Sequence, residues 1–111
     1  MDAEQIAAEI RSLPALFSNC DDDATPRQIG LIMFLTRDAF IDCRYDENPI
    51  VEYLWDDERP TELSMGKASR FIDYFGKKSE DGEWSVMRVG EMTILHRAWM
   101  ESKGQLLLFE L

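Results

Sequence analysis

The stretch TPRQIGLIMFLTRDAF, residues 25–40, carries the clearest structural signal in the chain. Thr25 can cap a helix, Pro26 suits its first turn, and Gln28 completes a capping box, so a helix is expected to begin here. The apolar residues that follow recur at helical spacing and give one broad apolar face. The stretch therefore predicts a helix over residues 25–40 that buries this face in a core.

Three more helices are predicted around this one. Residues 2–13 have an apolar face and end before Pro14. Shortly after this proline, Leu16 and Phe17 are expected to fold back onto the core. Residues 65–75 follow Ser64, a good N-cap, and precede a glycine suited to a helix end. The segment 49–56 begins with Asn-Pro, which favours a helix, although its apolar residues are also compatible with a strand.

The last third of the chain changes character and predicts strands. Segments 84–89, 92–100 and 105–111 are compatible with β-structure and are separated by glycine-bearing connections. We therefore expect an α+β fold in one domain, residues 1–111, with the four helices followed by a three-stranded antiparallel meander. A helix over residues 92–102 is the alternative, because the segment from His96 to Glu101 contains good helix formers.

Net charge is the most informative property of the composition. The chain of 111 residues has 12 basic and 22 acidic residues, a net charge of −10. Residues 1–62 hold 15 of the acids and 5 of the bases, so the whole excess lies there. Such a charge repels nucleic acid and anionic membranes and attracts basic protein surfaces.

Catalysis, cofactor binding and metal binding find little support in the residues. The single histidine, His96, has no nucleophile motif around it, and no phosphate-binding glycine pattern is present. Cys20, Cys43 and His96 are one ligand short of a closed zinc site. We therefore expect a protein that is not an enzyme and has no cofactor or metal. With two unpaired cysteines and no apolar run long enough to span a membrane, it is expected to work in the cytoplasm.

Two resemblances bear on function. The residues of the predicted helices 25–40 and 65–75 resemble a small two-helix module of uncharacterised bacterial and phage proteins; the matching positions are Thr25, Gln28, Ile32, Leu35, Leu63, Ser64, Ala68, Ser69, Ile72 and Asp73. In size, charge and lack of catalytic motifs the chain is similar to small acidic phage proteins that block host defence, including anti-CRISPR proteins and DNA mimics. This likeness implies an inhibitor in the host cytoplasm that occupies a basic, nucleic-acid-binding surface of a host protein.

The expected partner-binding residues are the acids of the first part and two aromatic residues among them. They are Asp21, Asp22, Asp23, Asp46, Glu47, Glu52, Tyr53, Trp55, Asp56, Asp57 and Glu58. Three of the aspartates also precede the helix 25–40, where they would complement its dipole. We expect the later acids to contribute more to binding, because Tyr53 and Trp55 would be aromatic anchors.

The alternative function is an accessory module of a DNA- or RNA-processing complex. This alternative is indicated by residues 63–111, in which acidic and basic residues are equal in number. Four cations there, Lys67, Arg70, Lys77 and Lys78, precede Trp84. A base could stack on an exposed indole beside these cations.

Overall fold

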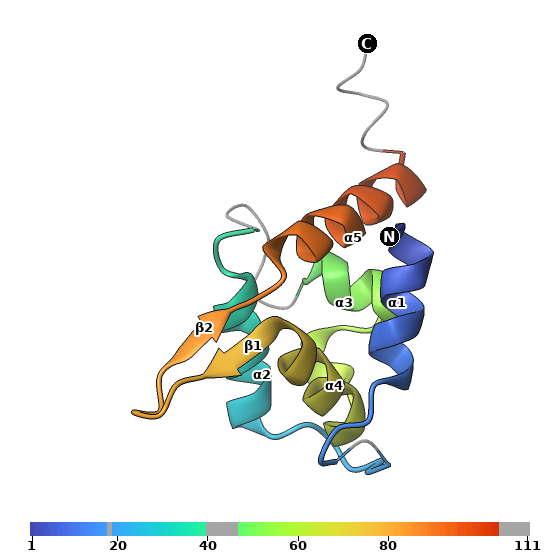
Figure 1. The fold of residues 1–111 in the computed structure, drawn as a ribbon. Helices are drawn as coiled ribbons and strands as arrows, with labels where there is room; N and C mark the ends of the chain where they lie inside the picture. The colour runs from blue at the N-terminus through green and yellow to red at the C-terminus, as the bar shows by residue number, and fades with distance from the viewer. Residues whose placement is uncertain (18, 40–46, 105–111) are drawn as a thin grey trace.

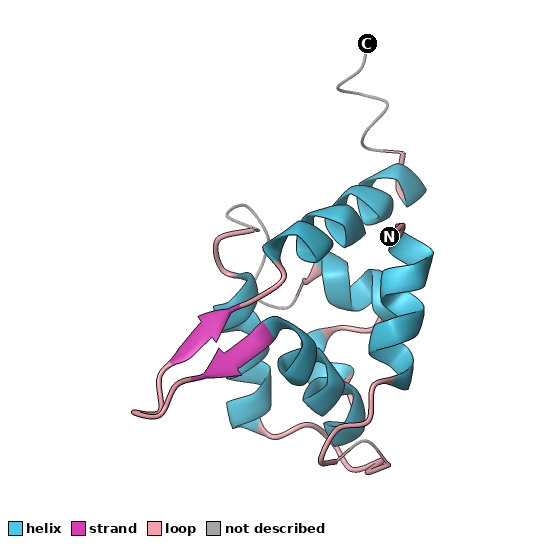
Figure 2. Ribbon diagram, viewed as in Figure 1, coloured by secondary structure: helices cyan, strands magenta, loops and turns pink. Residues whose placement is uncertain are grey.

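The computed structural model describes residues 1–17, 19–39 and 47–104. Most of this part is helical, and it contains a single two-stranded sheet (Figures 1 and 2). The helices are α1 (Ala3–Ser12), α2 (Pro26–Thr36), α3 (Pro49–Leu54), α4 (Met65–Phe75) and α5 (Val89–Ser102), with a 3-10 turn at Pro60–Glu62. The strands β1 (Gly76–Lys78) and β2 (Trp84–Val86) form the sheet.

The predicted helix starts are confirmed by their caps. The Asp2 carboxylate accepts from the Gln5 amide, and the Gln5 side chain accepts from the Asp2 amide. The same reciprocal pair joins Thr25 and Gln28 at α2, and the Ser64 hydroxyl accepts from the first turn of α4. Each pair satisfies backbone N–H groups that have no partner inside the helix.

The start of α3 is more deeply buried than the others, because Asn48 is only 1% exposed. Its Oδ1 accepts from the amides of Ile50 and Val51, each at 3.2 Å. Its Nδ2 donates to Thr36 Oγ1 at 3.0 Å, and that hydroxyl donates to the carbonyl of Ile32. One asparagine therefore caps α3 and also ties it to the last turn of α2, which settles residues 49–54 as helix rather than strand.

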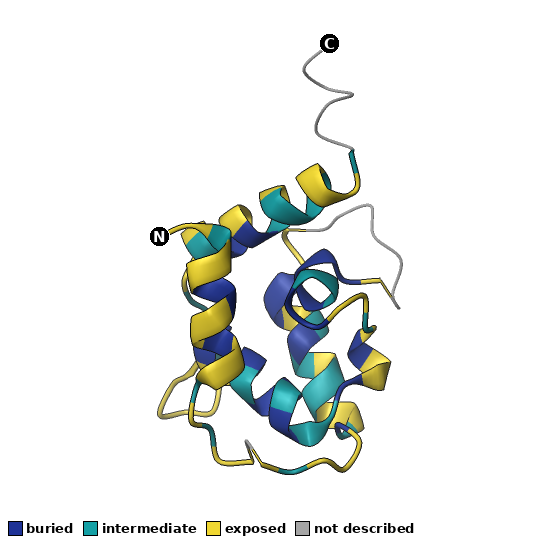
Figure 3. Cartoon of the chain, turned by 90° about the vertical axis from the view of Figure 1, so that its right-hand side faces the viewer, coloured by how far each residue is buried: buried dark blue, intermediate teal, exposed yellow. Residues whose placement is uncertain are grey.

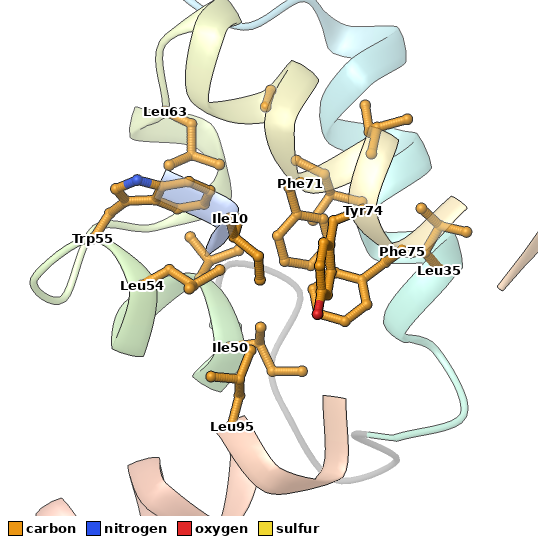
Figure 4. Packing of buried hydrophobic residues seen from close by; sticks show 14 of the residues in the cluster. Ile10, Leu35, Ile50, Leu54, Trp55, Leu63, Phe71, Tyr74, Phe75 and Leu95 are labelled. Atoms are coloured by element: carbon orange, nitrogen blue, oxygen red, sulfur yellow. The ribbon is translucent and has the colours of Figure 1, made fainter. Parts of the chain in front are cut away.

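The core lies between the helices, and α4 supplies its largest side chains. Phe71 and Phe75 are fully buried, with ring centroids 4.9 Å apart, and Tyr74 meets Phe75 edge to face (Figure 4). Ile10 of α1 and Leu54 of α3 pack in the same cluster. Figure 3 shows the resulting division of α1 into a buried inner face and an exposed outer face, as its apolar pattern predicts.

The predicted strand at residues 92–100 is wrong, because this segment lies within α5. Met92 and Leu95 are buried, while Thr93 and Ile94 between them are exposed, which is a helical and not an alternating pattern. The helix lies across α1 and α3 (Figure 1), and both contact it. Burial of Met92 and Leu95 against these helices outweighs the β-preference of Thr93 and Ile94.

The expected three-stranded meander is therefore also wrong. The described sheet is a hairpin in which Gly76 pairs with Val86 and Lys78 with Trp84. Its second strand covers only 84–86 of the predicted 84–89, because Arg88 adopts a left-handed conformation and leads directly into α5. The predicted strand 105–111 lies outside the described residues.

Three helices are shorter than predicted, and α1 (Ala3–Ser12) lacks only one residue at each end of the predicted 2–13. α2 ends at Thr36 because Arg37 and Ala39 donate to the carbonyls three residues before them, which tightens the chain into a turn. The predicted end at residue 40 lies outside the described part. α3 ends at Leu54, and Asp56 and Asp57 then adopt positive φ angles of 48° and 65° that redirect the chain. Aspartate enters this left-handed region more readily than most residues do.

Candidate partner-binding surface

The first predicted site, the acidic loop Asp21–Asp23, is exposed at all three residues. Its backbone runs beside the start of α4, where Asp23 and Ser64 form an antiparallel bridge. The amide of Met65 donates to the carbonyl of Asp22, and the amide of Gly66 donates to the carbonyl of Cys20. The backbone of this segment thus caps the first turn of α4, while the three carboxylates are presented to solvent.

Backbone hydrogen bonds also hold the chain on the C-terminal side of the acidic loop. Just after it, the amide of Ala24 donates to the carbonyl of Leu63 at 3.0 Å. Thr25 then begins α2 through its own capping box, so Asp21, Asp22 and Asp23 are not needed as side-chain caps. Among the described residues, no cation lies within 4.0 Å of their carboxylates. The acidic loop therefore combines a held backbone with carboxylates that form no ion pair within residues 1–17, 19–39 and 47–104.

The two predicted aromatic anchors are engaged inside the fold. Trp55 is 8% exposed and packs against Phe71, with ring centroids 6.5 Å apart. Tyr53 is half-buried, and its hydroxyl donates to a carboxylate oxygen of Glu4. Burial, together with this hydrogen bond, raises the pKa of Tyr53 to about 12. Neither ring is presented as an exposed anchor for a partner.

The later acids have partners of their own. Both carboxylate oxygens of Glu58 accept from Lys67 Nζ at 3.0 Å, and Asp57 accepts from Lys103 Nζ at 3.1 Å. Burial raises the pKa of the half-buried Glu52 above its usual value, although Lys103 acts in the opposite direction. Asp56 and Glu47 are exposed, and Asp46 lies outside the described residues. Two acids of this second cluster, Asp57 and Glu58, are therefore already ion-paired within the fold.

A pocket of about 450 Å³ lies beside the end of α3. Arg11 Nε donates to the carbonyl of Leu54 at 2.7 Å and thereby satisfies the C-terminus of this helix. The Glu58–Lys67 ion pair lines the same pocket, and Asp56 lies at its wall. Arg11 and Lys67, the cations that line this pocket, are therefore already bound to groups of the protein and are not available to a ligand.

An apolar groove that the sequence did not reveal runs beside α2. It consists of two adjoining hollows, about 320 and 270 Å³, that share Arg27, Leu31 and Trp84. Its apolar lining is Leu16, Phe17, Leu31, Phe34, Ile72 and Trp84. The expectation that Leu16 and Phe17 fold back onto the core is wrong: these side chains are 85% and 46% exposed. No periodic pattern marks the groove, because its walls come from separate segments.

The cations of the alternative function divide into two groups. Lys67 is bound to Glu58, and Arg70 Nε donates to the carbonyl of Leu13 at 3.2 Å. Lys77 and Lys78 are exposed on β1, and Lys78 pairs with Trp84 across the hairpin. Trp84 is half-buried and lines the groove.

The described residues contain neither a cluster of metal ligands nor a helix suited to cross a membrane. No three His, Cys, Asp or Glu side chains converge there as metal ligands would. His96 is half-buried, which lowers its pKa, while Cys20 is a free thiol and Cys43 lies outside the described residues. Within the same residues, no helix combines the length and the apolar character that crossing a bilayer requires.

Comparisons with known proteins gave no relative. No protein-family model matches the sequence, and no curated protein or solved structure is significantly similar to it.

Proposed function

We propose that the protein is a non-enzymatic binding protein that docks through its acidic loop, Asp21–Asp23, on a basic surface of another protein. The observation that supports this is the presentation of three adjacent exposed carboxylates, none of them in an ion pair with a described residue, on a backbone that is hydrogen-bonded to α4. A held loop loses little conformational entropy on binding, so more of its interaction energy contributes to affinity. The net charge of −10 adds long-range attraction to a cationic partner.

In its most specific form, the partner is a nucleic-acid-binding host protein and the chain is an inhibitor that occupies its basic groove. Carboxylates would then take the place of the nucleic acid phosphates. The acidic loop, rather than the cluster around Asp56, is expected to dominate, because Trp55 is buried and Glu58 and Asp57 are already paired.

The test is affinity capture from a bacterial lysate with wild-type protein and a variant in which Asp21, Asp22 and Asp23 are changed to Asn. A matched control changes three exposed acids outside the acidic loop to Gln; these are Glu9 of α1 and Glu80 and Glu83 of the hairpin turn. Both variants lose the same charge, so only a local role distinguishes them. We expect the first variant alone to lose a nucleic-acid-binding partner, and wild-type capture to weaken as salt shortens the Debye length.

Equal capture by both folded variants would exclude the acidic loop as the docking site. Capture that does not change between low and high salt would exclude a charge-driven interaction altogether. Cooperative unfolding of each variant must be shown first, since only folded proteins can be compared.

A second candidate function, contact with nucleic acid, is favoured by one observation. Trp84 and Phe34 line the same hollow as Arg27, and exposed Lys78 lies opposite Trp84 in the hairpin. Aromatic rings beside cations are the usual means of holding single strands. A gel-shift at low salt tests it: retention of single-stranded DNA by wild-type protein but not by Trp84→Ala would favour this function over docking on a basic protein.

A further inference from the structure

The apolar groove gathers large apolar side chains that the fold leaves in water. Leu16, Phe17 and Phe34 are 85%, 46% and 40% exposed, and all three line it. They come from the loop after α1 and from α2, and Trp84 of β2 joins them. Contiguous exposed apolar surface of this kind is typical of interaction sites, whereas isolated apolar residues need no explanation.

The groove has the length of a short helix. α2 forms one wall, with Thr25 and Gln28 in one hollow and Gly30 and Phe34 in the other. At 1.5 Å of rise per residue, the wall from Thr25 to Phe34 extends about 13 Å. Apolar side chains at positions i, i+3 or i+4, and i+7 of a docked helix span about 10 Å, so two turns of a partner helix match the groove.

The two ends of the groove differ in charge. Asp73 lines the end next to Leu16, and burial raises the pKa of its carboxyl. Asp23 lies two residues before Thr25, which places its Cα within about 7 Å of that end. Among the described residues, neither carboxylate has a cation within 4.0 Å. At the other end, the Arg37 guanidinium lies 3.8 Å from the centre of the Phe34 ring.

We infer that the groove binds a short amphipathic helix of a basic protein, with its apolar side chains along α2 and its Lys or Arg residues at the end marked by Asp73 and the acidic loop. This inference rests on the proposed function and adds the form of the partner's contact. Attraction between the partner's Lys or Arg residues and the acidic end sets the direction of the bound helix. Burial of the partner's apolar side chains against Leu31 and Trp84 supplies the affinity. Arg27 is exposed and lines both hollows, and the aliphatic stem of an arginine can pack on apolar surface while its charge stays in water.

The experiment uses the intact protein and synthetic fluorescein-labelled probes. One peptide places Leu on a single helical face with Lys elsewhere, and a second has the same composition with the Leu residues scattered around the helix. A Leu/Glu amphipathic peptide and a single-stranded oligothymidine complete the set. Fluorescence anisotropy gives affinity, and the emission change that Trp84→Phe abolishes shows whether a probe reaches the groove.

The amphipathic Leu/Lys peptide should bind about tenfold or more tightly than its scrambled form, because one buried leucine accounts for a factor of this order. Leu16→Ser should remove most of that preference. Because Leu16 is 85% exposed, the change does not threaten the fold. Val89→Ser is the control: Val89 is 56% exposed and lines neither hollow of the groove, so this change should have no effect.

Equal affinity for the two Leu/Lys peptides, tighter binding of the Leu/Glu peptide or of oligothymidine, or no binding of any peptide would each overturn the inference. The proposed function fails separately, when changing Asp21, Asp22 and Asp23 to Asn leaves the binding of both Leu/Lys peptides unaltered. If both peptides bind equally and lose affinity in that variant, the acidic loop binds basic partners and the groove does not.

Discussion

Gly76, at the junction of α4 and β1, should not tolerate a side chain. A Cβ there would lie 2.9 Å from the carbonyl oxygen of Ile72 and 3.0 Å from two ring carbons of Trp84. The carbonyl cannot retreat easily, because it accepts the Gly76 amide at the end of α4. The φ angle of −116° suits any residue, so the whole penalty of Gly76→Ala comes from overpacking. Overpacking of this kind costs about 1–3 kcal/mol.

A loss of that size should lower the melting temperature by about 4–12 °C in a domain of this length. Urea unfolding followed by far-ultraviolet circular dichroism measures the free energy of unfolding directly. Gly30→Ala is the matched control: its Cβ would meet nothing within 4 Å in the interior of α2. That change should stabilise the protein by about 0.5–1 kcal/mol, because alanine favours helix more than glycine does. A Gly76→Ala protein as stable as wild type, or equal losses in both variants, would refute the reasoning.

Three further predictions concern the interior. Asn48→Ala removes the cap of α3 and the bond to Thr36, so it should cost about 2–3 kcal/mol in urea unfolding; a loss no greater than that of exposed Asn19→Ala would contradict this. Tyr53 has a folded pKa of about 12, so stability should fall as pH rises from about 10 towards 12. Tyr53→Phe should lose that part of the decline, and an identical alkaline profile would show that the phenol is not responsible. Burial lowers the pKa of His96, so its contribution to stability should disappear as pH falls below about 6.5, and His96→Gln should flatten the acid limb of the stability curve.

The helix starts could be predicted because their signals are local. A capping box needs only two side chains three residues apart, and Asp2 and Thr25 both begin helices as expected. The helix 65–75 was predicted with both of its observed ends, since Ser64 and Gly76 mark them in the sequence. These features depend on backbone groups within one turn and are insensitive to the rest of the fold.

The conformation of residues 89–102 could not be decided in the same way. Thr93, Ile94 and Trp99 favour strand on intrinsic grounds, yet Met92 and Leu95 are buried only when the segment is helical and packs on α1 and α3. The hairpin was partly hidden for a related reason: Lys77 and Lys78 have no apolar alternation, and they form a strand because Trp84–Val86 pairs with them.

The surface was the least predictable part. Trp55 and Glu58 looked like binding residues because charge and aromaticity can be seen in a sequence, whereas their engagement by Phe71 and Lys67 cannot. The apolar groove had no sequence signal, because Leu16, Leu31 and Trp84 meet only after folding. The exposure of the acidic loop can be predicted from its polar residues, whereas the backbone hydrogen bonds that join it to α4 cannot.

The packing of α5 on α1 has a consequence for synthesis on the ribosome. The core is closed by Met92 and Leu95, which follow nearly all the other buried residues in the chain. While these two residues remain in the exit tunnel, α1 and α3 expose the apolar faces that α5 will cover. The core of the nascent chain therefore cannot close until α5 has left the tunnel, and only then can its helices assemble cooperatively.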